Sequence, residues 1–216
     1  MHSQGQARQP SNPKGMPATD DEIREKYLER AIRELNAFSR RLQTCPHCPR
    51  GQLMPVLGSG HPQADIFMIK HSARPAEVEE GVAFYGRTGN ALMKSFRRLT
   101  IDPLAVYGTL CVKCPVPDPV MADPACVARL AEEVAIVQPK IVVVMGPEAL
   151  AVLNELQLPL ARELEPSPGQ VQPLTPSIEA LYVPNIDDAL DEDGAKREFW
   201  SAFRVLGQWW ADLPPY

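Results

Sequence analysis

The sequence predicts an α/β protein with three α/β/α layers around a central, mainly parallel four-stranded sheet. Apolar, β-prone segments alternate along the chain with amphipathic helical segments. This alternation favours parallel pairing of the strands, with helices covering both faces of the sheet. The 216 residues contain no internal repeat and no second composition regime, so a single domain with a terminal tail is expected.

Four segments have the composition of buried strands. The clearest is IVVVM at 141–145, a continuous apolar run of the kind that forms the interior of a parallel sheet. ADIFMI at 64–69 and VYGTLCV at 106–112 are similar, and a short strand is expected at 181–183.

Five segments have helical periodicity. The first is expected to be capped by Asp20 or Asp21 and to continue to about residue 43, because its apolar residues recur at helical spacing. The others are expected at about 88–99, 123–137, 147–156 and 195–210. The proline-rich stretches between these elements are expected to be loops.

The N-terminal 19 residues are rich in Gln, Pro, Ser and Gly and are expected to be a disordered tail. They contain no apolar core of a secretory signal, and the chain has no run of 18 apolar residues. A cytoplasmic location is the default expectation.

The charge is unevenly distributed in this acidic chain. The net charge is −5, yet residues 40–98 contain nine Lys or Arg against four Asp or Glu. A basic segment inside an acidic protein can be a phosphate-binding face, or it can be an ordinary solvated surface. Charge alone does not decide between the two.

Five cysteines, at 45, 48, 111, 114 and 126, suggest a metal centre. Cys45 and Cys48 form a C-x2-C pair in a proline-rich turn, which can direct two thiolates at one centre, and Cys114 and Cys126 supply a second pair. Four thiolates suit zinc or an iron–sulfur cluster, and the wide spacing of the second pair favours the cluster. Cys111 lies inside an expected strand and is interpreted as a buried apolar residue.

The order of motifs resembles that of the iron–sulfur uracil-DNA glycosylases, families 4 and 5, over about residues 25–210. The matching segments are CPHC at 45–48, ADIFMI at 64–69, AFYGRTGNAL at 83–92, VKCPVP at 112–117, Cys126 and PKIVVVMGPEAL at 139–150. The resemblance implies a uracil-DNA-glycosylase-like domain over 20–213 and a 4Fe–4S cluster on Cys45, Cys48, Cys114 and Cys126. It also implies DNA binding and base-excision DNA repair.

The resemblance assigns roles to further residues. Phe84 corresponds to the phenylalanine that stacks on the extruded base. Lys70, Arg74 and Arg87 fall in or beside motif loops that line the DNA face, so they are candidates to contact phosphates. Val183-Pro184-Asn185 corresponds to the family's His-Pro-Ser motif, so Asn185 is a candidate for substrate binding.

Three positions depart from the family pattern. His71 stands where the family has an acidic residue, and it is the candidate catalytic residue because histidine can act as a base or nucleophile. Leu110 replaces the asparagine that reads the edge of uracil, and Val183 replaces the histidine that stabilises the departing base. Leucine cannot form hydrogen bonds to a base, so weak, altered or absent glycosylase activity is expected.

Two other interpretations remain open from the sequence. The chain can be a non-catalytic module that retains the fold for protein binding, with Phe199, Trp200, Phe203, Trp209 and Trp210 forming an aromatic helix surface. The other is a zinc protein unrelated to DNA repair, which holds only if the thiolates do not bind an iron–sulfur cluster.

Overall fold

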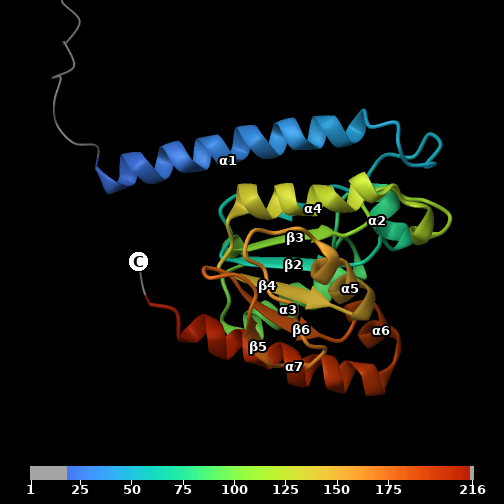
Figure 1. Cartoon of the computed structure of the whole chain (residues 1–216). Coiled ribbons are helices and arrows are strands. Elements are labelled where there is room, and N and C mark those ends of the chain that lie inside the picture. Colours follow the sequence, from blue (N-terminus) through green and yellow to red (C-terminus); the bar gives the residue numbers. More distant parts are fainter. Residues whose placement is uncertain (1–18, 215–216) are drawn as a thin grey trace, which may run out of the picture.

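The computed structural model describes residues 19–214 and contains one six-stranded sheet between two layers of helices (Figure 1). The strand order is β1-β3-β2-β4-β6-β5. The four central strands are parallel: β3 (Val106–Leu110), β2 (Ile66–Lys70), β4 (Ile141–Met145) and β6 (Glu179–Val183). The α/β class is therefore confirmed. All of the expected tail except Thr19 lies outside the described residues.

Two short edge strands extend the expected four-stranded sheet to six. β1 (Ser59–Gly60) pairs antiparallel with β3, and β5 (Val171–Pro173) pairs antiparallel with β6. Both are partly exposed and lack an apolar run, so the sequence carries no periodic signal for them.

The helices cover both faces of the sheet. On one face lie α3 (Arg87–Leu99) and α7 (Asp193–Ala211); on the other lie α4 (Pro124–Val137) and α5 (Pro147–Glu155). The long helix α1 (Asp20–Gln43) lies across the outside of α4 (Figure 1). Short elements complete the chain: α2 (Pro75–Glu80), α6 (Ile186–Asp191) and the 3-10 turns η1 (Pro103–Ala105) and η2 (Pro119–Met121). No described helix is long and apolar enough to span a membrane.

Strand β4 shows how the sheet divides the interior into two cores. Ile141, Val143 and Met145 face the core under α3 and α7. Val142 and Val144 face the core under α4 and α5. Successive residues of a strand point to opposite faces, so a strand buried on both sides is a continuous apolar run.

Helix α1 is capped by Thr19, one residue before the expected acidic cap. The Thr19 hydroxyl accepts a hydrogen bond from the backbone N–H of Glu22, and the Glu22 carboxylate accepts one from the N–H of Thr19. This reciprocal pair is a capping box. Asp20 lies in the first turn instead, where its charge complements the helix dipole.

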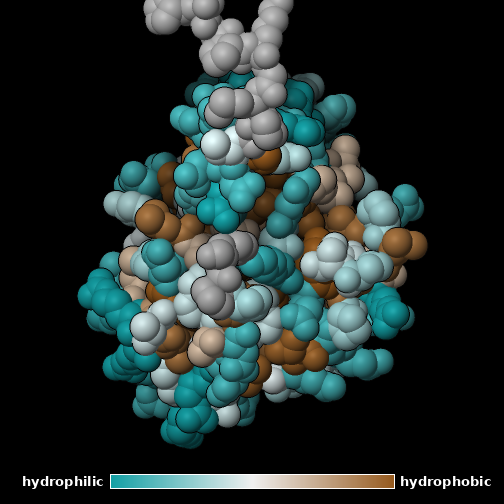
Figure 2. All heavy atoms as spheres, turned by 90° about the vertical axis from the view of Figure 1, so that its left-hand side faces the viewer, coloured by the Kyte–Doolittle hydropathy of each residue, from teal (hydrophilic) through white to brown (hydrophobic). Residues whose placement is uncertain are grey.

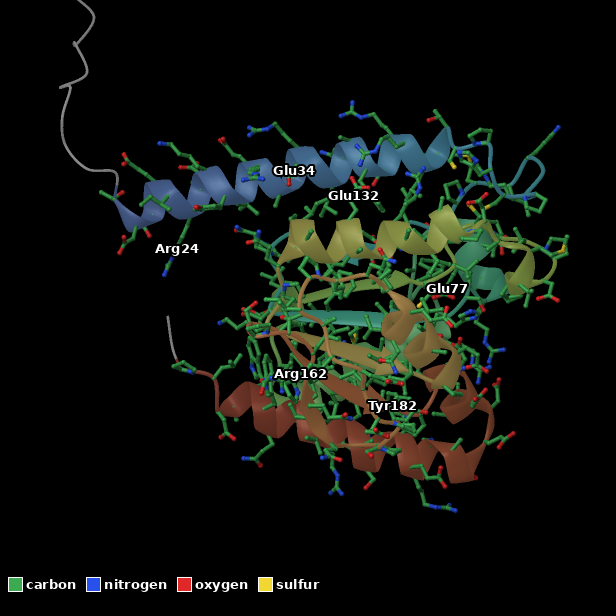
Figure 3. All side chains as sticks on the ribbon, in the orientation of Figure 1. Arg24, Glu34, Glu77, Glu132, Arg162 and Tyr182 are labelled. Carbon is green, nitrogen blue, oxygen red and sulfur yellow. The ribbon has the colours of Figure 1, made fainter. Side chains whose placement is uncertain are left out.

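Helix α1 is attached to the body through its C-terminal half. Phe38 and Leu42 are buried, and Arg41 forms an ion pair with Glu132 of α4. Figure 3 shows Glu132 between the two helices. This attachment fixes the segment that follows α1, which carries the C-x2-C pair.

The aromatic residues of α7 pack against the sheet instead of forming the free surface expected of a protein-binding helix. Phe199 and Phe203 are buried with ring centroids 5.0 Å apart, and Phe96 of α3 lies 6.2 Å from Phe203. The partly buried Trp200, Trp209 and Trp210 pack against the same core. Amphipathic spacing places these rings on the sheet, because burying them there stabilises the domain.

The ends of the molecule differ in character. The carboxyl ends of the parallel strands lie at the right of Figure 1, with α2, α6 and the start of α5. The opposite end, seen in Figure 2, is covered mostly by hydrophilic side chains with small apolar patches between them. Ligand sites in open parallel sheets form beyond the carboxyl ends of the strands, so a ligand site is expected at the right-hand edge.

We expect Phe203→Ala to lower the free energy of unfolding by about 3–5 kcal/mol, because it leaves a cavity between α3, α7 and the sheet. Urea unfolding followed by circular dichroism measures the change. The matched control is Leu104→Ala, whose side chain is exposed, and it should change stability by less than about 0.5 kcal/mol. Equal small effects for both variants would contradict the packing described for α7.

Candidate functional site

A cavity of about 340 Å³ lies at the carboxyl edge of the sheet. Its walls come from the end of β2 and the residues after it, from the first turns of α5 and α6, and from the loop containing η2. The lining residues are Lys70, His71, Ser72, Asp118, Pro119, Val120, Glu148, Asn185 and Asp187. Three of the seven predicted substrate- or DNA-contacting residues therefore meet here: Lys70, His71 and Asn185.

The floor of this cavity contains a buried ion network. The Lys70 ammonium lies 2.7 Å from a carboxylate oxygen of Glu77 and 2.9 Å from one of Asp187. Lys70 is 1% exposed, and Thr88 donates to the second oxygen of Asp187 at 3.0 Å. The ammonium is thus compensated inside the protein, which differs from the exposed phosphate contact expected from the sequence.

Glu77 also holds the loop that contains Phe84. Its carboxylate accepts hydrogen bonds from the backbone N–H groups of Arg74, at 2.6 Å, and Phe84, at 2.5 Å. Phe84 has a φ of 59°, a left-handed conformation that costs a phenylalanine about 1–2 kcal/mol. The hydrogen bond from Glu77 helps to hold that conformation.

The Phe84 ring packs on the sheet next to the buried lysine. The Lys70 ammonium lies 5.6 Å from the ring centroid. A Cβ atom at Gly108 of β3 would come within 2.6 Å of the ring, so a glycine is needed there. Phe84 is 8% exposed and does not line the cavity, although its ring lies against Lys70, which does.

Arg74 and Arg87 meet at one carboxylate on the rim of the site. Their guanidinium groups lie 2.8 Å and 3.1 Å from opposite oxygens of Asp191, at the end of α6. The hydrogen bond from Arg74 lowers the pKa of Asp191, with Arg87 adding to the effect. Both arginines remain exposed enough to reach a ligand.

The residues at the motif positions that differ from the family pattern lie in different surroundings. His71 follows β2 and is partly exposed to the cavity. Leu110 and Val183 are fully buried in the apolar core on the α3 and α7 side. Asn185 caps α6 by accepting the N–H of Asp187 at 3.0 Å, and its side chain borders the cavity.

Three thiols gather next to this edge. The sulfur atoms of Cys48, Cys114 and Cys126 all lie within 4.8 Å of one another, and all three residues are buried. They come from the loop after α1, the loop after β3 and the first turn of α4. Three buried thiols from separate segments, this close together, could hold one metal centre.

The electrostatics of this group favour metal binding. The sulfur atoms of Cys114 and Cys126 share a hydrogen bond at 3.9 Å, which lowers the pKa of Cys126 and raises the pKa of Cys114. Burial raises the pKa of Cys48. The lowered pKa of Cys126 favours its thiolate, which is the form of cysteine that binds metals.

Cys45 and Cys111 lie outside this group of three. The Cys45 sulfur is contacted by the Arg129 guanidinium at 3.6 Å, one helical turn after Cys126 in α4. Cys111 is buried in the apolar core under α4, where burial raises its pKa to about 12. This placement agrees with the interpretation of Cys111 as a buried apolar residue.

A second buried ion network links the thiol group to the sheet. Lys113, next to Cys114, lies 2.5 Å from the carboxylate of Glu133 in α4, and neither side chain is exposed. Tyr107 and Thr109 of β3 donate to the same carboxylate at 2.9 Å and 3.1 Å. The loop carrying Cys114 is therefore fixed to both β3 and α4.

A comparison with known families identifies the fold. The sequence model of the Uracil DNA glycosylase superfamily matches residues 57–204, which include the sheet and every residue that lines the cavity. The chain belongs to this superfamily.

One curated relative gives a narrower likeness. A type-4 uracil-DNA glycosylase from Sulfurisphaera tokodaii is 29% identical over 121 residues. The alignment covers 52% of this chain and 54% of the relative, so the chain spans about half the length of the curated relative it matches. Superfamily membership places this fold among DNA repair proteins.

Sequence reasoning missed three acidic residues at the carboxyl edge of the sheet: Glu77, Asp187 and Glu148. Two had a local signal. Glu77 follows Arg74-Pro75-Ala76, a helix start with proline in the first turn and an acid two residues later. Asp187 follows Asn185, a preferred N-cap residue. Neither signal indicates that the acid pairs with Lys70.

We expect Lys70→Met to destabilise the protein by about 3–5 kcal/mol, because it leaves the buried carboxylates of Glu77 and Asp187 without a counter-charge. Thermal and urea unfolding measure the loss. Lys26→Met, on an exposed turn of α1, is the control and should change stability by less than about 0.5 kcal/mol. A Lys70→Met protein as stable as its control would show that the buried ammonium is not needed.

Proposed function

We propose that this chain is a DNA-binding iron–sulfur member of the uracil-DNA glycosylase superfamily, with altered or lost base excision. The observation that carries the proposal is the convergence of buried Cys48, Cys114 and Cys126. Two of these cysteines, Cys114 and Cys126, flank the loop whose η2 turn lines the cavity at the carboxyl edge. The likeness to a type-4 uracil-DNA glycosylase supports the same assignment.

The thiol group fits the cluster by its chemistry. Three buried sulfur atoms, one with a lowered pKa that favours the thiolate, match the donor set of iron–sulfur sites. Cys45, held near α4 by Arg129, would be the fourth ligand of a 4Fe–4S cluster. Such a cluster would join the segment after α1, the end of β3 and the start of α4, which is a structural role.

The cavity supports binding of an extruded nucleotide. Enzymes that act on a base in duplex DNA rotate it out of the stack into a pocket. Arg74 and Arg87 are exposed on the adjoining rim, where they could contact the flanking phosphates. Phe84 lies behind the cavity floor and would support the pocket through its contact with Lys70.

The polar groups of the cavity support a change in activity. Leu110 and Val183 are buried in the core, so neither supplies a hydrogen bond to a base. His71, Ser72 and Glu148 line the cavity instead. His71 is the residue we assign to general-base or nucleophilic chemistry, if the protein retains any excision activity.

We expect anaerobically purified protein to be brown and to absorb near about 400 nm, as thiolate-bound iron–sulfur centres do. Single replacement of Cys48, Cys114 or Cys126 by serine should remove most of the iron and the absorbance. Cys111→Ser is the control and should retain both. Iron and zinc are quantified by elemental analysis. Colourless wild-type protein with stoichiometric zinc would disprove the iron–sulfur assignment.

We expect excision of uracil from duplex DNA to be at least about 10²–10³-fold slower than by the Sulfurisphaera tokodaii relative assayed alongside, because donors that stabilise the departing base are missing. A panel of damaged bases measures any altered specificity, and His71→Ala should abolish whatever excision remains. Ser72→Ala is the matched control from the same cavity wall. Uracil excision at the rate of the relative would refute the proposed loss of activity.

A further inference from the structure

A second, larger hollow lies on the other side of α6 from the cavity. It has a volume of about 720 Å³ and lies between α3, α6 and the first turns of α7. We call it the α3–α7 groove. Ile186 of α6 and Phe199 of α7 contribute to its apolar floor.

The walls of the α3–α7 groove are basic. Arg87, Lys94 and Arg98 line it from α3, and Lys196 and Arg197 from α7. No aspartate or glutamate is among the residues that line it. This concentration of positive charge occurs in a chain whose net charge is −5.

Most of these cations have no internal partner. Arg87 pairs with Asp191, but among residues 19–214 no carboxylate lies within 4.0 Å of the charged groups of the other four. Helix α1, by contrast, pairs Arg30 with Glu34 and Arg33 with Glu29. Unpaired, clustered cations are the pattern of a surface that binds a polyanion.

Helix α3 itself is unusual in composition. Its 13 residues include four cations and no acidic residue, and Arg87 occupies its first position. A cation there opposes the helix dipole, at a cost of about 0.3–1 kcal/mol. Arg97 and Arg98 lie in the last turn, where cations complement the dipole. Local helix stability therefore accounts for the cations at the end of α3 but not for Arg87 at its start.

The groove also offers a stacking surface. The Arg98 guanidinium lies over the Trp200 ring, 5.8 Å from its centroid. Aromatic rings and guanidinium planes are the groups on which proteins stack unpaired bases. The cations of α3 extend from residue 87 to residue 98, about 16 Å along the helix at 1.5 Å per residue. That length matches several successive phosphates better than one isolated anion.

The groove begins at the rim of the cavity. Arg87 lines the groove and shares Asp191 with Arg74, which also lies 3.5 Å from the cavity residue Asp187. A strand whose nucleotide occupies the cavity can therefore continue past α6 into the groove. Resting on the proposed DNA-binding function, we propose that the α3–α7 groove binds a single-stranded stretch of nucleic acid adjoining the nucleotide in the cavity.

The test compares two DNA probes with the full-length protein. One is a blunt duplex; the other is the same duplex with a ten-nucleotide single-stranded extension, tested separately at the 3′ and the 5′ end. Fluorescence anisotropy between 50 and 200 mM salt gives the affinity and its salt dependence. The variant is Lys94→Gln/Arg98→Gln. Its control, Arg24→Gln/Lys26→Gln, removes two exposed charges from α1 on the opposite helical layer.

We expect the wild type to prefer one extended probe, and the groove variant to bind that probe about tenfold more weakly at 50 mM salt. Its salt slope should fall by about 1.4, because two contacts to a single strand are lost. Affinity for the blunt duplex should stay within about twofold, and the control variant should match the wild type. Circular dichroism confirms that both variants are folded.

Several results would overturn this assignment. If the groove variant loses equal affinity for blunt and extended DNA, the groove contributes only non-specific electrostatic attraction. If it loses affinity for neither probe, the groove does not contact the DNA. If the variant loses binding of a labelled poly-glutamate peptide while keeping extended DNA, an acidic protein segment is the ligand. Failure of the wild type to bind the blunt duplex would instead overturn the proposed function itself.

Discussion

The buried ammonium of Lys70 is the interaction on which the carboxyl edge of the sheet depends. It joins the end of β2 to Glu77 of α2 and to Asp187 of α6. Each carboxylate holds something further, because Glu77 binds the N–H of Phe84 and Asp187 accepts from Thr88 of α3. An isolated charge could not be buried at this depth, so all three groups must be present together. The loops that form the cavity are therefore positioned by one charge.

The end of β3 is fixed by a second set of contacts of the same kind. Lys113 pairs with Glu133, and the next residue, Cys114, joins the thiol group with Cys48 and Cys126. A cluster bound there would stabilise a loop that is already held to α4 by a buried ion pair. The two networks lie under opposite layers of helices, yet both end at the same sheet edge. The carboxyl edge of the sheet is thus supported by buried ion pairs on both faces of the sheet.

The sequence was most informative where burial follows a local pattern. β4 was predicted at its observed bounds because both of its faces are apolar, and α3 and α4 were predicted to within one residue. The ion networks were not predictable in this way, because Lys70 and Asp187 are 117 residues apart and only the tertiary fold brings them together. Glu133 had a signal that went unused, since it shares the apolar helical spacing of Leu130 and Val137. The motif positions Leu110 and Val183 were recognised as departures, but their burial in the core required the structure.

Helix α6 lies between the cavity and the α3–α7 groove, and it presents different residues to each. Ile186 and Ala189 face the α3–α7 groove, whereas Asp187 faces the cavity. Asp191, at its end, binds Arg74 on one side and Arg87 on the other. A phosphate that binds either arginine would compete with Asp191 for that guanidinium group. Asp191 would then keep its ion pair with the other arginine. The short helix that follows β6 thus couples the rim of the cavity to the start of the groove through a single carboxylate.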